Sequence, residues 1–145
     1  MMTPNRLARE LDARLNGPHA AEHTAGAASL AAECIRFLNY ATGSHADAGV
    51  EFPSTVYEIT ADLKLTAERM PQLFEQLSRW LVAELNAGRL GSDTPNAPND
   101  AVIDAVYRLA RAATLAEHLG TELGEVQNAL AFVNGRGPNR SERAA

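Results

Sequence analysis

The chain has 145 residues, of which 46% are hydrophobic, and its net charge is −5 at pH 7. This length predicts one globular domain, and no apolar stretch approaches the roughly 20 residues that cross a membrane. Residues 17–134 hold seven Lys or Arg and fifteen Asp or Glu, a net charge of −8. Because nucleic-acid binding needs a basic stripe, we expect neither a nucleic acid nor a membrane as partner.

The compartment is predicted from the single cysteine, Cys34, and from the lack of a secretory leader at the start of the sequence. Small secreted domains usually carry several cysteines that form disulfides. We therefore expect a cytoplasmic protein. Cys34 lies on the apolar face of a predicted helix, which favours a buried structural thiol.

The first two predicted helices precede a loop over residues 43–53. Thr3 and Pro4 are typical of a helix start, and this helix ends at Gly17–Pro18. The second helix begins between Pro18 and Ala27, ends at Ala41, and carries an apolar face. The members of that face are Ala27, Leu30, Ala31, Cys34, Ile35, Leu38 and Ala41.

Two further helices are predicted between the loop and residue 87. Thr55 with Glu58 forms a capping box that begins a short helix ending near Leu63. The next helix covers residues 66–87 and begins either with Thr66 as its cap or at Pro71. Its apolar period predicts a core face made of Met70, Leu73, Phe74, Leu77, Trp80, Leu81 and Leu85.

The C-terminal helix is predicted over residues 99–134 from nine apolar positions in strict 3-4 alternation. That spacing places a seam on one helix face. Gly120 lies within the pattern, and we expect one continuous helix, with a break at Gly120–Thr121 as the alternative. Residues 135–145 are predicted to be a disordered tail. The seam consists of Ala105, Leu109, Ala112, Ala116, Leu119, Leu123, Val126, Leu130 and Val133.

Together these elements predict an all-α fold. Three main helices, over residues 27–41, 66–87 and 99–134, form a bundle with two shorter ones, and residues 1–134 make a single domain. No alternation of period two is long enough to predict a strand.

One short motif resembles a metal site. His19, Glu22 and His23 match the His-x-x-Glu-His pattern of inverted zinc proteases, in which two histidines hold zinc and the glutamate acts as a base. A third protein ligand is missing from the pattern. A zinc hydrolase is therefore the weakest of three functional hypotheses, and we expect no metal, no cofactor and no catalytic residue.

Two interpretations concern the segment around residues 52–57. Its opening, Pro53 to Tyr57, resembles the start of a recognition helix in helix-turn-helix regulators. The eleven-residue loop before it and the acidic residues within it favour a connector helix instead. Tyr40, Phe52 and Tyr57 flank the loop, and a small-molecule cleft beside them is the second functional hypothesis.

The central sequence also resembles a known group of proteins. Residues 52–58 (FPSTVYE), together with Asp62–Leu63, 70–73 (MPQL), Gln76–Leu77 and Trp80–Leu81, resemble small all-helical proteins of actinobacteria, over roughly residues 27–133. Twelve Arg against one Lys, with 27 Ala, agree with a high-GC coding background. The resemblance implies a helical fold and assigns no functional residues.

The favoured functional hypothesis is a non-enzymatic interaction module that forms a homodimer. A helix over residues 99–134 is about 54 Å long, and the predicted helix over residues 66–87 is too short to cover it. Part of the apolar seam would then be exposed, which is typical of an interface. The expected interface residues are Leu119, Leu123, Val126, Leu130 and Val133.

Overall fold

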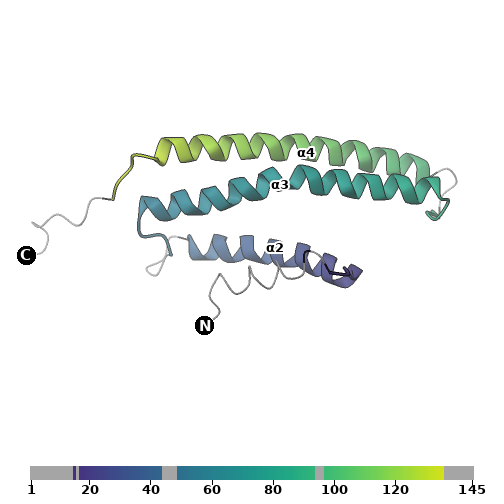
Figure 1. The fold of residues 1–145 in the computed structure, drawn as a ribbon, viewed down its shortest axis with the longest axis horizontal. Coiled ribbons are helices and arrows are strands. Elements are labelled where there is room, and N and C mark those ends of the chain that lie inside the picture. Colours follow the sequence, from purple (N-terminus) through teal and green to yellow (C-terminus); the bar gives the residue numbers. More distant parts are fainter. Residues whose placement is uncertain (1–14, 16, 44–48, 94–96, 136–145) are drawn as a thin grey trace, which may run out of the picture. The chain divides into compact units, whose positions relative to one another are not determined.

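The computed structural model describes residues 15, 17–43, 49–93 and 97–135. These residues form three helices, labelled α2, α3 and α4 in Figure 1, and no strand, so the predicted all-α class is confirmed. The helix expected from Thr3 and the tail expected after Gly135 lie outside the described residues. The chain divides into two compact units, residues 1–49 and 50–145.

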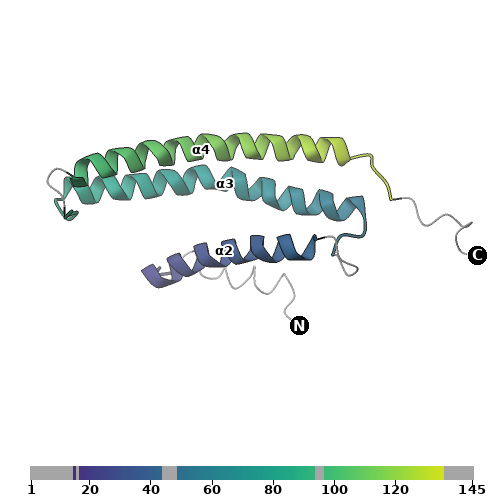
Figure 2. The ribbon, with the colours of Figure 1, turned by 180° about the vertical axis from the view of Figure 1, so that it is seen from behind.

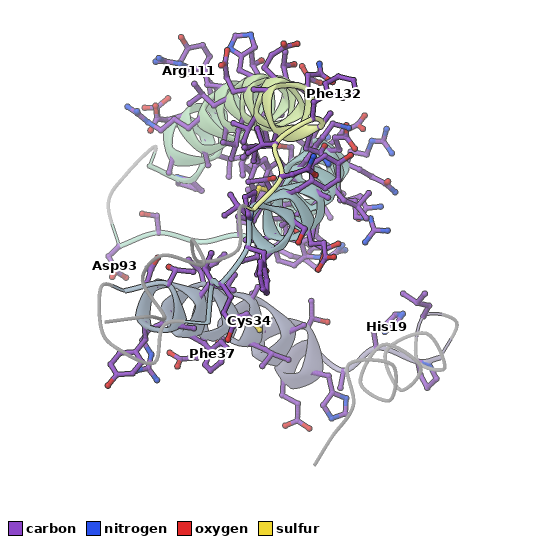
Figure 3. The ribbon with its side chains drawn as sticks, turned by 90° about the vertical axis from the view of Figure 1, so that its left-hand side faces the viewer. His19, Cys34, Phe37, Asp93, Arg111 and Phe132 are labelled. Carbon is purple, nitrogen blue, oxygen red and sulfur yellow. The ribbon has the colours of Figure 1, made fainter. Side chains whose placement is uncertain are left out.

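The first unit contains α2, Ala21–Ala41, which ends where the sequence predicted. Thr42 follows the helix, and its backbone N–H donates to the carbonyl of Leu38 at 2.9 Å. Cys34 and Phe37 lie on this helix (Figure 3), and no residue of α2 is buried within the described chain. The thiol of Cys34 is exposed, so the expectation of a buried cysteine is wrong.

In the second unit, α3 is one helix, Pro53–Asn86, where the sequence predicted two. It begins at Pro53 rather than at a Thr55 capping box, because proline fits the first helical position with its preset φ and its missing N–H. Thr66 does not act as a cap, since its hydroxyl donates to the Asp62 carbonyl at 2.8 Å within the helix. Pro71 lies inside α3 and does not end it.

The end of α3 matches the prediction and has a well-defined cap. Gly88 has a φ of +66°, the left-handed conformation that glycine adopts without strain. The N–H of Gly88 donates to the Leu85 carbonyl and that of Arg89 to the Glu84 carbonyl, each at 3.0 Å, which is a Schellman motif.

The side chains at this cap also pair. The Arg89 guanidinium donates from Nε and Nη2 to the two carboxylate oxygens of Glu84, at 2.7 and 2.6 Å. These hydrogen bonds lower the pKa of Glu84 and raise that of Arg89.

The last helix, α4, covers Ala97–Leu130 without a break at Gly120. It runs side by side with α3 in an antiparallel hairpin (Figures 1 and 2). Both helices have 34 residues. The expected length mismatch is therefore absent, because the two segments predicted separately before residue 87 form one helix as long as α4.

Small residues lie between the two helices. The buried apolar side chains of the described chain are Ala67, Val102 and Ala116, 1%, 7% and 6% exposed. Gly120 is buried beside Ala67, and a Cβ atom on it would lie 3.3 Å from Cγ of Glu68. Such residues let the helix backbones approach closely, but they leave the hairpin with little core of its own.

The α4 residues that face α3 depart from the predicted seam in its C-terminal half. Gly120 and Gln127 are buried or half-buried, whereas Leu119 and Val126 are 50% and 38% exposed. Seven residues of an α-helix fall about 20° short of two full turns, so the contacting row moves to later positions along the helix. The seam was predicted from an exact seven-residue repeat, which takes no account of this drift.

Candidate functional site

The candidate metal residues lie at the start of α2. His19 precedes the helix (Figure 3), and His23 Nε2 lies 3.8 Å from Glu22 Oε1 on exposed side chains. Within the described residues, no three His, Cys, Asp or Glu side chains come together in a way that would hold a metal ion. Among the residues that the structure describes, the motif therefore gains no third ligand.

The three residues of the expected small-molecule cleft belong to different units. Tyr40 is on α2 and is 77% exposed, whereas Phe52 and Tyr57 belong to the α3–α4 unit and are 57% and 39% exposed. Tyr57 lines an open groove between α3 and α4, and Tyr40 lines a separate open pocket on α2, so neither of these cavities brings the three together.

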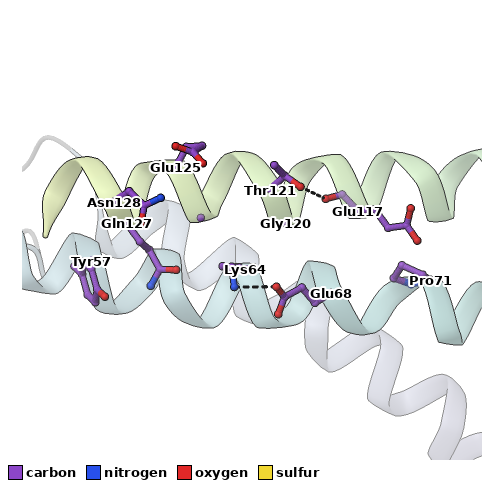
Figure 4. Close-up of a pocket in the computed structure, with 11 residues that line it drawn as sticks. Tyr57, Lys64, Glu68, Pro71, Glu117, Gly120, Thr121, Glu125, Gln127 and Asn128 are labelled. Carbon is purple, nitrogen blue, oxygen red and sulfur yellow. Dashed lines mark hydrogen bonds and ion pairs between the residues drawn. The ribbon is translucent and has the colours of Figure 1, made fainter.

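The groove has a volume of about 620 Å³ and is mostly polar (Figure 4). At its centre, Lys64 Nζ lies 2.8 Å from Glu68 Oε1. Cβ atoms built on the glycines of α4 would meet this pair, at 3.3 Å from Glu68 Cγ for Gly120 and 3.3 Å from Lys64 Cε for Gly124. The glycines therefore leave the room that the ion pair occupies. The groove is lined by Tyr57, Lys64, Glu68, Pro71, Glu117, Gly120, Thr121, Gly124, Glu125, Gln127 and Asn128.

Large apolar side chains are exposed elsewhere on the same two helices. On α3 four of them come one residue before a residue that faces α4; for example, Leu73 precedes Phe74, and Leu77 precedes Ser78. On α4 the same holds for Leu119, which precedes Gly120. We call this set the apolar face. Its members are Met70, Leu73, Leu77, Trp80, Leu115, Leu119 and Val126, between 37% and 64% exposed.

These apolar residues lie on one side of the hairpin. Moving one residue back along a helix rotates the direction of the side chain by about 100° around the helix axis. Because α3 and α4 are antiparallel, that rotation leads to the same side of the hairpin on both helices. Groove residues such as Glu68, Glu117 and Thr121 come one residue after a facing residue, so the groove lies on the other side. The hairpin therefore carries the groove on one side and the apolar face on the other, although Ile103, Tyr107 and Val82 are also exposed on the groove side.

The expected interface residues of α4 separate into two groups. Leu119 and Val126 belong to the apolar face, and Val133, beyond the helix, is 48% exposed. Leu123 and Leu130 are half-buried on the side of α4 that faces α3. The sequence thus located part of the exposed surface on α4.

The α3 half of the apolar face was assigned to a core by the sequence. Trp80 is 58% exposed and Leu73 49%, whereas Phe74 and Leu81 are half-buried. The apolar stripe of α3 is wider than one partner helix covers, and α4 covers only its later edge. The width of the apolar stripe in the sequence was the signal that could have predicted the exposure of these residues.

Among the described residues, no helix combines the length and apolarity that crossing a membrane requires. Comparisons with protein families, with curated proteins and with solved structures find no match to this chain.

Proposed function

We propose that this chain is a non-enzymatic interaction module that self-associates through the apolar face of its α3–α4 hairpin. The observation that carries the proposal is the position of seven half-exposed large apolar residues on one side of two antiparallel helices. Exposed apolar patches of this kind mark protein interfaces. Two such hairpins apposed by these faces make a four-helix bundle, an arrangement that buries all four apolar stripes.

The energetics of the hairpin support this role. Its buried apolar side chains are two alanines and a valine, which contribute little transfer free energy. Exposed ion pairs within one helix, such as Arg108–Asp104 at 2.9 Å, contribute about 0–1 kcal/mol each. A partner on the apolar face supplies the burial of large side chains that the hairpin lacks.

Cytoplasmic location is part of the proposal. Cys34 is an exposed, unpaired thiol. A reducing compartment keeps such a thiol from forming intermolecular disulfides.

The test compares two substitutions on α4. Leu115 on the apolar face and Ile103 away from it are 64% and 66% exposed. They are twelve residues apart, which is roughly 120° around the helix. We expect Leu115→Glu to weaken self-association at least about 30-fold, as loss of a central interface residue does, and Ile103→Glu to leave it unchanged.

The measurement is sedimentation of the full chain at micromolar concentrations, with circular dichroism to verify folding. A wild-type chain that sediments as a monomer at tens of micromolar refutes self-association. A monomer that Leu115→Glu unfolds indicates instead that a segment of the same chain covers the apolar face.

The groove supports a second candidate function, small-molecule binding. Its volume of about 620 Å³ lies within the range of ligand sites, and Tyr57, predicted from the sequence, lines it. A thermal-shift screen with metabolites tests this candidate, with Tyr57→Ala as the control. The mostly polar, open lining makes it the weaker proposal.

A further inference from the structure

We draw no further inference here: the strongest candidate, the apolar face on one side of the α3–α4 hairpin, already carries the proposed function, and nothing in the structure shows what covers it.

Discussion

The two glycines of α4 differ in how much room their surroundings leave, and this difference predicts opposite outcomes for alanine substitution. Glycine inside a helix costs roughly 1 kcal/mol relative to alanine. At Gly124, the new Cβ would meet Lys64 Cε at 3.3 Å and Cδ at 3.8 Å. These atoms lie near the end of a flexible side chain that is 34% exposed, and they can move by a few tenths of an ångström. We expect Gly124→Ala to raise the free energy of unfolding by about 0.5–1 kcal/mol.

At Gly120 the same change meets a tighter environment. The new Cβ would lie 3.3 Å from Glu68 Cγ and 3.9 Å from both Ala67 Cβ and the Glu68 backbone nitrogen. Gly120 is buried, and Glu68 Cγ is held close to its own backbone. Relief requires the helices to separate, which offsets the gain in helix propensity. We expect Gly120→Ala to change stability by less than about 0.5 kcal/mol, and Gly120→Leu to cost roughly 1–3 kcal/mol by overpacking.

Urea denaturation followed by far-UV circular dichroism measures these differences. All variants are compared at one protein concentration, because association makes apparent stability depend on concentration. Equal stabilisation by both alanine substitutions would refute a close approach of the helices at Gly120. Tolerance of Gly120→Leu at wild-type stability would refute it more strongly.

Three further predictions concern α3. Gly88→Ala should lower the free energy of unfolding by about 1 kcal/mol in thermal or urea melts, because Gly88 has a φ of +66°; no loss would show that the cap adds no stability. Glu84 has a lowered pKa in the fold through its hydrogen bonds to Arg89, so its contribution is present above the unfolded pKa and is lost as pH falls through the folded pKa. Glu84→Gln should therefore flatten the acid limb of the stability profile, and an unchanged limb would contradict this. Pro71→Ala should raise stability by about 1–2 kcal/mol, because alanine restores an N–H donor to the Ala67 carbonyl inside α3; destabilisation would show that the proline ring contributes more through packing.

The dimer hypothesis now depends on a different observation from the one that first suggested it. The sequence argument relied on a C-terminal helix longer than its neighbour, but α3 and α4 have equal lengths. What supports association in the structure is the lateral position of Leu115, Leu119 and the exposed residues of α3. The homodimer itself stays a prediction.

The sequence by itself determined the helical class and several helix ends. Three local signals follow from backbone geometry and side-chain sterics. They are the apolar period of residues 99–134, the helix-ending glycine at Gly43 and the helix-ending segment Asn86–Gly88. The last two match the structure, with α2 ending at Ala41 and α3 at Asn86, whereas α4 ends at Leu130, four residues before the predicted end. Such signals are readable because they depend on near neighbours in the chain.

Only the tertiary structure decided which apolar residues are covered. Thr55 and Pro71 resemble helix boundaries in sequence, yet both lie within α3, because pairing along the whole of α4 stabilises a single helix across them. Trp80 and Leu119 fit the apolar period as well as the buried residues do, but one partner helix covers about a third of a helix surface and leaves the adjacent rows exposed. Periodicity gives the face that a residue lies on, whereas its burial depends on how many neighbours pack against that face.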